Sequence, residues 1–304
     1  MRQENGPRRA LIVANPAAGQ MSGAVADELV ALCRRHVETV ELRLTTAKGD
    51  AGALLRRAFD TEAPDVVLAA GGDGTAGEVA AALTDAGDAP MVIVPFGSAN
   101  SCYRALWHDR PWRETVTTAL TGEAMVRRLD LIRVVETDAL ALVGVGSGLN
   151  PVAVAAARAA KELGRARYES VIADVVARFR PYRGVVAVDD DVIYDGDTVA
   201  VYVGGGRYRG GQFDFLPWSV LDDGLLDVCL ITGRTPAADV AGLARAGRIA
   251  DAPGVRHARG KRVRIERTDG AALDFEHDGE VITGESREFT VEVVPGAAAM
   301  LTPP

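Results

Sequence analysis

The chain has 304 residues, of which 48% are hydrophobic and 25% charged, and this composition excludes disorder, collagen and coiled coil as descriptions of the whole chain. A chain of this length exceeds the common size of one hydrophobic core, so we expect two domains. The formal net charge is −8, from 42 acidic against 34 basic residues. That charge argues against a nucleic-acid-binding protein, because duplex binding requires a concentrated basic surface.

The N-terminal part alternates strand and helix patterns as far as residue 129. Apolar strand-like runs separated by helical spacing indicate a parallel sheet covered on both faces. We expect strands over residues 10–14, 37–44, 65–70 and 91–94, and helices over residues 23–36, 51–59 and 76–83. This part therefore predicts a doubly wound α/β domain over residues 1–129.

The pattern changes from residue 131 onward. Short β-type segments separated by Asp-Gly and Gly-Gly pairs are typical of antiparallel sandwiches. The segments cover residues 131–135, 139–145, 184–188, 198–203, 226–231, 262–265 and 289–294, with one Ala-rich helical interruption over about 152–179. We predict an antiparallel β-sandwich domain over residues 130–304, with a loosely held tail from residue 295.

Cysteine and histidine spacing predicts no structural zinc site. Cys33, Cys102 and Cys229 lie far apart without a C-x-x-C pair, and the four histidines form no group with ligand spacing. We therefore expect a reducing compartment. No apolar stretch reaches the roughly 18 to 20 residues needed to span a bilayer. A cytoplasmic protein is expected, touching a membrane at most from one side.

The strongest chemical signal is Gly71-Gly72-Asp73-Gly74-Thr75, between an apolar strand and a helix. Glycines let backbone N–H groups approach an anion, and a helix N-terminus adds partial positive charge. A phosphate loop alone does not need Asp73, which could orient a cation or accept a proton from an attacking hydroxyl. Taken alone, the motif is equally well explained as a tight turn capped by Asp73.

Two further loops follow neighbouring strands. Asn15-Pro16-Ala17-Ala18-Gly19 follows the first strand, and Pro95-Phe96-Gly97-Ser98-Ala99-Asn100 follows the strand over residues 91–94. Because the carboxyl ends of parallel strands meet at one edge of the sheet, where open α/β folds bind ligands, the three loops should converge. The sequence therefore predicts a nucleotide site.

In this order, the motifs resemble the signature of the diacylglycerol kinase catalytic family, which includes sphingosine and soluble bacterial lipid kinases and is distantly related to NAD kinases. The likeness continues through Asp130-Leu131, Lys161 to Tyr168, Gly204 to Gly211, Leu221 to Asp227 and His277 to Glu280. It implies a nucleotide-binding domain over residues 1–129, a β-rich substrate domain over residues 130–304, and last residues that return to the first domain.

The resemblance also implies roles for individual residues, with ATP and Mg²⁺ as cofactors. Asp73 and Glu280 match the acidic positions assigned to base and metal work, and which of them takes the proton stays open. The positions matched to nucleotide binding are Asn15, Gly71, Gly72, Gly74, Thr75, Glu78, Gly97, Ser98 and Arg167. Asp222 and Asp223 match a second, structural Mg²⁺ site, although an Asp-Gly turn explains them equally. A hairpin turn is likewise an alternative for Asp278-Gly279-Glu280.

Three departures from the family pattern concern the acceptor. Asn100 is followed by Ser101 where the family has Asp, Asn150 replaces an acid, and Gly205 replaces an Asn. Neutral Ser101 and Asn150 can hydrogen-bond but cannot neutralise an ammonium group. We therefore assign Asn100, Ser101 and Asn150 to the acceptor and favour a neutral alcohol over a cationic sphingoid base.

The expected activity is ATP-dependent phosphoryl transfer to a hydroxyl of a lipid-like alcohol, with peripheral membrane contact and no nucleic acid partner. An NAD kinase or a kinase of a small non-lipid metabolite is an alternative, although Gly77 stands where Asn often precedes Glu78 in the related kinases. A catalytically idle nucleotide- or lipid-binding regulator is another. The sequence leaves the oligomeric state open and is compatible with a dimer.

Overall fold

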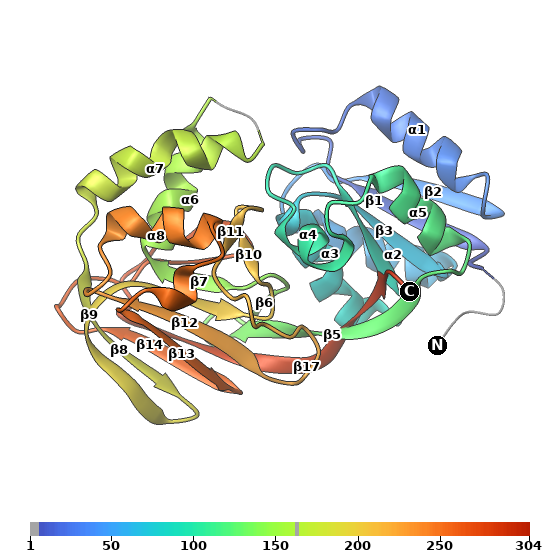
Figure 1. The fold of residues 1–304 in the computed structure, drawn as a ribbon. Helices are drawn as coiled ribbons and strands as arrows, with labels where there is room; N and C mark the ends of the chain where they lie inside the picture. Colours follow the sequence, from blue (N-terminus) through green and yellow to red (C-terminus); the bar gives the residue numbers. More distant parts are fainter. Residues whose placement is uncertain (1–5, 162–163) are drawn as a thin grey trace. The chain divides into compact units, whose positions relative to one another are not determined.

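The computed structural model describes residues 6–161 and 164–304, and it divides into two units (Figure 1). Unit 1 contains the residues up to Leu129 together with Gly296–Pro304, and unit 2 is Asp130–Pro295. Two strands, β5 (Met125–Val134) and β17 (Glu288–Thr302), have residues in both units. Glu162 and Leu163, within the segment matched to the family between Lys161 and Tyr168, lie outside the described residues.

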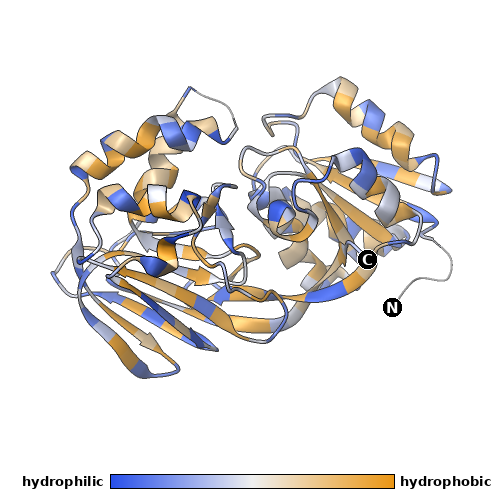
Figure 2. Ribbon diagram, viewed as in Figure 1, coloured by the Kyte–Doolittle hydropathy of each residue, from blue (hydrophilic) through white to orange (hydrophobic). Residues whose placement is uncertain are grey.

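A parallel sheet with strand order β17-β4-β3-β1-β2 forms the centre of unit 1. Its strands besides β17 are β1 (Arg9–Ala14), β2 (Thr39–Leu44), β3 (Val66–Gly71) and β4 (Met91–Pro95), and the helices are α1 (Gly23–Cys33), α2 (Asp50–Thr61), α3 (Asp73–Ala86), α4 (Ser101–Trp107) and α5 (Trp112–Leu120). Strands β3 and β4 are buried over nearly their whole length, and Figure 2 shows the central strands as mostly hydrophobic.

The strand order places the helices on both faces of this sheet. The connection from β1 to β2 moves along the sheet in one direction, whereas those from β2 to β3 and from β3 to β4 move in the other. Because such crossovers are right-handed, α1 lies on one face and α2 and α3 on the opposite face. The predicted doubly wound domain is confirmed. The direction reverses between β1 and β3, which is where open α/β sheets bind ligands.

Unit 2 is an antiparallel β-sandwich, as the sequence predicted, and its described residues form three helices where one helical interruption was expected. Its strands besides β5 and β17 are β6 (Ala139–Ala141), β7 (Val145–Gly148), β8 (Tyr182–Val188), β9 (Asp191–Gly204), β10 (Tyr208–Arg209), β11 (Phe213–Asp214), β12 (Leu226–Thr232), β13 (Val255–Gly260), β14 (Arg262–Arg267), β15 (Phe275–His277) and β16 (Glu280–Ile282). The helices are α6 (Leu149–Ala159), α7 (Ala166–Arg178) and α8 (Ala237–Arg245), followed by the short 3-10 helix η1 (Ile249–Asp251).

Strand β12 and the second half of β9 are buried on both faces because both faces are covered. Alternate residues such as Val201 and Val228 enter the core of the sandwich. Their neighbours Tyr202 and Cys229 pack with Leu149 of α6 and with residues of α7 and α8 on the other face (Figure 1). Period-2 alternation thus distributes the side chains of one strand between two cores.

The structure differs from the sequence-based expectation in several places. Helices α4, α5 and α8 were not expected. The stretch predicted as one helix over about 152–179 forms two helices, α6 and α7, and Gly164 between them has φ +63°, a left-handed conformation that favours glycine. The expected loose tail is wrong. Strand β17 continues to Thr302 and pairs in parallel with β4 at Met300 and Met91, because Ala298, Met300 and Leu301 are apolar and become buried.

Candidate active site

Three loops of unit 1 are hydrogen-bonded to one another at the carboxyl edge of the sheet. We call them the β1 loop (residues 15–19), the β3 loop (residues 71–75) and the β4 loop (residues 95–100). Asn15 Nδ2 donates to Thr75 Oγ1 at 3.4 Å, which joins the first two. The N–H groups of Phe96 and Gly97 both donate to the carbonyl oxygen of Gly71, at 2.9 and 3.0 Å. The sequence predicted this convergence.

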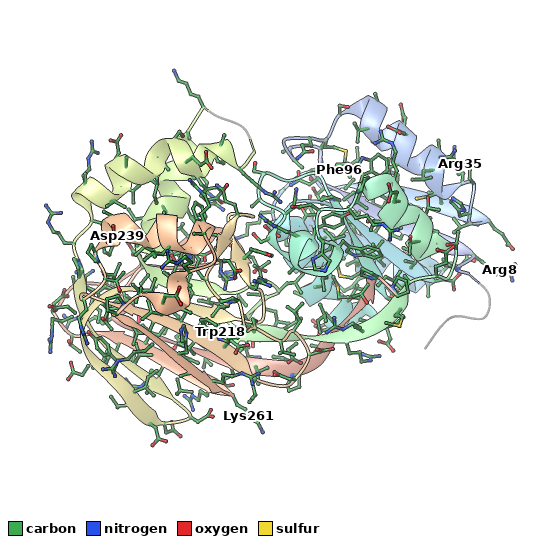
Figure 3. All side chains as sticks on the ribbon, viewed as in Figure 1. Arg8, Arg35, Phe96, Trp218, Asp239 and Lys261 are labelled. Carbon is green, nitrogen blue, oxygen red and sulfur yellow. The ribbon has the colours of Figure 1, made fainter. Side chains whose placement is uncertain are left out.

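The β3 and β4 loops touch where both carry glycine. A Cβ built on Gly72 would lie 3.1 Å from Cα of Gly97, which is tighter than ordinary contact. A Cβ built on Gly97 would overlap Cα of Gly72 and lie 2.9 Å from Oδ1 of Asn100. Phe96 beside it is buried against Trp112, with ring centroids 5.5 Å apart (Figure 3). These glycines therefore permit a close approach of two backbones.

The β3 loop leads directly into helix α3. Gly72 stands at the N-cap position, and among the described residues no side chain caps this helix. Its first N–H groups point toward the end of the sheet, where they can bind phosphate oxygens. Thr75 is buried in the first turn, and a Cβ on Gly71 would collide with its side chain.

Asp73 has internal partners. Its Oδ2 accepts the backbone N–H of Ser101 at 2.9 Å, and its Oδ1 accepts that of Cys102 at 3.1 Å. The carboxylate thus joins the β3 loop to the start of α4 and has a fixed orientation. Each carboxylate oxygen carries two lone pairs, so one N–H bond to each does not exhaust its capacity to accept a proton or bind a cation. Asp73 is partly exposed.

Two residues assigned to the acceptor are engaged within unit 1. Asn100 is buried in a left-handed conformation with φ 53°. Its Oδ1 accepts the N–H of Gly97 at 3.0 Å, and its Nδ2 donates to the carbonyl of Gly97 at 2.9 Å. Ser101 is also buried, at 3% exposure. Asn100 therefore closes the β4 loop, and Ser101 provides a backbone donor to Asp73.

The remaining nucleotide-site residues of unit 1 differ in their surroundings. Ser98 is partly exposed in the β4 loop. Glu78 lies one turn beyond Thr75 on α3, and burial raises its pKa although the backbone amides of Gly49 and Ala51 favour its charged form. Those amides belong to the start of helix α2, so the Glu78 carboxylate supports that helix.

In unit 2, Asp278-Gly279 forms the two-residue turn between β15 and β16. Both residues have positive φ, 46° and 82°, as a type I′ hairpin requires. The Asp278 carboxylate accepts the N–H groups of Leu142 and Val143, each at 2.7 Å. The hairpin turn that the sequence offered as an alternative is therefore formed, and Glu280 is the first residue of β16 after it. Nε2 of His277 lies 3.7 Å from Oε2 of Glu280.

Sequence reasoning missed Glu276, whose side chain is the partner of Asn150. Glu276 is only 2% exposed, and its Oε1 accepts a hydrogen bond from Nδ2 of Asn150. Its Oε2 accepts the N–H of Gly279 at 2.8 Å. Burial raises the pKa of Glu276 to about 7. Residue 150 is itself neutral, but its side chain is hydrogen-bonded to a buried acid. Only its place two residues before the Asp-Gly turn could have indicated it.

The loop that carries Asp222 and Asp223 lies against a cation, Arg259 of strand β13. Asp223 forms an ion pair with Arg259, and its Oδ1 accepts the N–H of Leu225 at 3.1 Å. Nε of Arg259 also lies 2.8 Å from the buried carboxylate of Asp227. Among residues 6–161 and 164–304, no group of three His, Cys, Asp or Glu side chains is arranged to hold a metal ion. The donor set at Asp223 fits a guanidinium better than a second Mg²⁺.

Arg165 and Arg167 lie at the start of helix α7. Gln212 of the glycine-rich segment donates to the carbonyl of Arg165 at 3.4 Å, so the two segments are in contact. Nε of Arg167 is buried without a hydrogen-bond partner among the described residues. A buried donor of this kind fits a site for an anion.

Comparison with known proteins identifies the family. The model for the diacylglycerol kinase catalytic domain matches residues 9–134, and that for the YegS C-terminal NAD kinase β-sandwich-like domain matches residues 143–302. The chain belongs to the diacylglycerol kinase catalytic family. A protein of Stenotrophomonas maltophilia named "Probable lipid kinase YegS-like" is 30% identical over 98% of this chain and 96% of its own length. A similarly named protein of Pseudomonas aeruginosa is 30% identical over 90% and 88%.

Solved structures confirm the fold. A diacylglycerol kinase from Bacillus anthracis has a TM-score of 0.71 at 19% identity, and the match covers 98% of each chain. An NAD kinase from Archaeoglobus fulgidus, solved with ATP, is more distant, with a TM-score of 0.52 at 14% identity over 96% of this chain and 92% of that one. The family models and the relatives confirm the predicted family, and with it a kinase that transfers a phosphoryl group to an alcohol. No helix in the described part of the chain is long and apolar enough to cross a membrane.

Proposed function

We propose that the chain transfers the terminal phosphoryl group of ATP to a hydroxyl of a neutral, lipid-like alcohol. The observation that carries this proposal is the mutual hydrogen bonding of the β1, β3 and β4 loops at the point where the strand direction reverses. Backbone N–H groups at a helix start suit phosphate oxygens, and the positioned carboxylate of Asp73 suits the end of the triphosphate.

Phosphoryl transfer needs positioning and charge neutralisation more than covalent chemistry by the protein. We assign the β3 loop and the start of α3 to holding the phosphates, with Asn15, Thr75 and Ser98 beside them. Arg167 would contribute a planar donor for phosphate oxygens.

Mg²⁺ prefers carboxylate, water and phosphate oxygens, and the carboxylate of Asp73 fits that preference. When bound, the ion would neutralise charge on the phosphates. We assign the roles of proton acceptor and Mg²⁺ ligand to Asp73 and Glu280. The two N–H bonds to Asp73 fix the orientation of its carboxylate.

The acceptor is proposed as a neutral alcohol. Ser101 is a hydroxyl where the family has an acid, and it is buried, so it supplies no exposed negative charge for an ammonium group. The names of the relatives support a lipid acceptor. A lipid acceptor requires contact with a membrane surface, which we propose is peripheral.

The test is phosphoryl transfer from γ-labelled ATP with Mg²⁺ to a panel of acceptors. The panel contains diacylglycerol in mixed micelles, a sphingoid base, NAD and a polyol. We expect transfer to the neutral lipid. Transfer to NAD alone would favour the NAD kinase alternative, and binding of ATP without transfer to any acceptor would favour an idle regulator.

Asp73→Asn is the matched variant for this assay. It keeps one acceptor for the N–H groups of Ser101 and Cys102 but removes the charge, so we expect turnover to fall by roughly 100-fold or more while ATP still binds. Asp189→Asn is the control, because Asp189 also accepts two backbone N–H groups, from Lys261 and Arg262, away from the loops. Equal activity of the two variants would contradict the role of Asp73.

A further inference from the structure

Glu276 lies in a row of residues that crosses four strands of unit 2. In β15 it pairs with Gly146 of β7, Gly146 pairs with Tyr202 of β9, and Tyr202 pairs with Cys229 of β12. Tyr202 and Cys229 face helices α6, α7 and α8. Because residues paired across neighbouring strands share a face, Glu276 faces the same helices. A carboxylate on this apolar face requires partners.

In this row Gly146 has no side chain, and the side chain of Asn150 on α6 occupies the space beside it. A Cβ on Gly146 would collide with the Asn150 amide and lie 3.1 Å from its Cγ. Asn150 is 7% exposed, and its Nδ2 donates to Oε1 of Glu276. The missing side chain at Gly146 thus brings the first turn of α6 into contact with the acid on β15.

The second oxygen of Glu276 holds the turn that precedes Glu280. Oε2 accepts the N–H of Gly279 at 2.8 Å. The other turn residue, Asp278, binds the N–H groups of Leu142, Val143 and Gly144 at 2.7, 2.7 and 3.2 Å. Hydrogen bonds from the carboxylates of Glu276 and Asp278 therefore fix both residues of the turn, and Glu280 is the next residue along the chain.

We propose that Glu276 is a positioning residue that connects Asn150 on α6 to the turn carrying Glu280, and that Asn150 and Glu276 form an exchangeable amide–acid pair. Position 150 carries an amide, and the acid that it hydrogen-bonds lies on strand β15, which pairs with β7 at Gly146. The catalytic consequence rests on the proposed role of Glu280.

Charged and polar neighbours of Glu276 act on its pKa in both directions. Burial and the neighbouring Asp278 raise its pKa, to about 7, whereas Arg209, Asn150 and the amide of Gly279 favour the charged form. Burial raises the pKa of the Tyr202 hydroxyl, and the nearby charge of Glu276 raises it further. A second carboxylate at position 150 would add repulsion to an already unfavourable environment.

Four variants test the pair. Glu276→Ala removes both hydrogen bonds, so we expect kcat to fall by roughly 10- to 100-fold, the cost of a small misplacement of a catalytic group, with KM for ATP unchanged. Glu276→Gln keeps an acceptor for Gly279, and the Asn150 amide can rotate to accept its N–H, so activity should be retained.

Asn150→Asp places two carboxylates together, so its kcat should fall, and the loss should grow as pH rises through 7. The double variant Asn150→Asp/Glu276→Gln exchanges the amide and the acid and should restore kcat to within a few-fold of the starting protein at both pH 6 and pH 8. Glu288→Ala is the control, because the Glu288 side chain forms an exposed ion pair with Arg264.

Hydrogen exchange of the peptide covering residues 275–282 supplies a readout that does not depend on activity. Faster exchange in Glu276→Ala, and not in Glu276→Gln or Glu288→Ala, supports the proposal. Unchanged exchange in Glu276→Ala, or a double variant no better than Asn150→Asp, would overturn it. If the starting protein transfers phosphate to no acceptor, the proposed function fails, and exchange alone decides the positioning role.

Discussion

The close approach of the β3 and β4 loops makes a methyl group at Gly97 a sharp probe of the nucleotide site. In Gly97→Ala the added Cβ would overlap Cα of Gly72 and lie 3.0 Å from its backbone N and 2.9 Å from Oδ1 of Asn100. Two of these atoms belong to the backbone of the neighbouring loop, and the third belongs to an amide that closes the β4 loop. None of them can move away as a flexible side chain would.

To reach ordinary contact, the two loops must separate by about 1 Å, since packed interiors leave no space to absorb a methyl group. Overpacking of this kind costs about 1–3 kcal/mol of folding free energy. A displacement of about 1 Å can lower activity roughly 100-fold when it moves positioning groups. We therefore expect a moderate fall in the free energy of unfolding and a much larger loss of kcat/KM for ATP.

The assay is phosphoryl transfer at varied ATP together with urea-induced unfolding. Gly23→Ala is the control, because a Cβ on Gly23 meets nothing within 4 Å and the residue lies outside the three loops. It should leave activity unchanged and stabilise helix α1 slightly. Full activity and unchanged ATP affinity in Gly97→Ala would refute the reasoning that contact between these loops builds the site.

Two further predictions concern stability. Because the pKa of Glu276 is about 7 in the folded chain against an ordinary value of 4.5, the folded state holds an extra proton between these values, and the free energy of unfolding should decrease as pH rises from 4.5 to 7. Glu276→Gln should lack this decrease, and above pH 7 it should be more stable than the starting protein by at most about 3 kcal/mol. Urea titrations at pH 4, 5.5, 7 and 8.5 measure the free energy of unfolding of both proteins. Parallel curves of this free energy against pH would show that Glu276 does not titrate in this range. Arg259→Met leaves the fully buried carboxylate of Asp227 without its cation, and since Arg259 is itself 41% exposed the loss should be about 2 kcal/mol, below the usual range for breaking a buried pair. Adding Asp227→Asn should recover part of that loss, and no recovery would assign the effect to packing.

Asp73 has a structural role besides the chemical role that we propose for it. Its carboxylate accepts the first N–H groups of α4 from a position inside the β3 loop. Any substitution there changes the junction between β3 and α4 as well as the charge at the site. This is why turnover, ATP binding and unfolding must be measured together for Asp73→Asn.

The sequence predicted the fold class and the family from local patterns. Runs such as those over residues 66–71 and 91–95 are apolar on both faces because helices cover both sides of the sheet, and the strands follow directly from that pattern. The glycine-rich motif around Asp73 predicted a phosphate-binding loop, because glycine, an acid and a helix start are neighbours in the chain. Convergence of the three loops also followed, since parallel strands place their carboxyl ends at one edge.

Contacts between distant residues could not be read in this way. Asn150 and Glu276 are 126 positions apart, and only the pairing of β7 with β15 and the absent side chain of Gly146 bring them together. The internal partners of Asp73 and Asn100, and the cation that Arg259 supplies to Asp223, were equally invisible.

The sequence by itself determined the backbone of the central strands of unit 1 and the residue types at their ends, because periodicity and turn chemistry act over a few neighbouring residues. The tertiary structure alone decided which polar groups satisfy one another inside the protein. Burial makes an unpaired carboxylate or amide costly, so its partner is chosen by position in space and leaves no pattern along the chain.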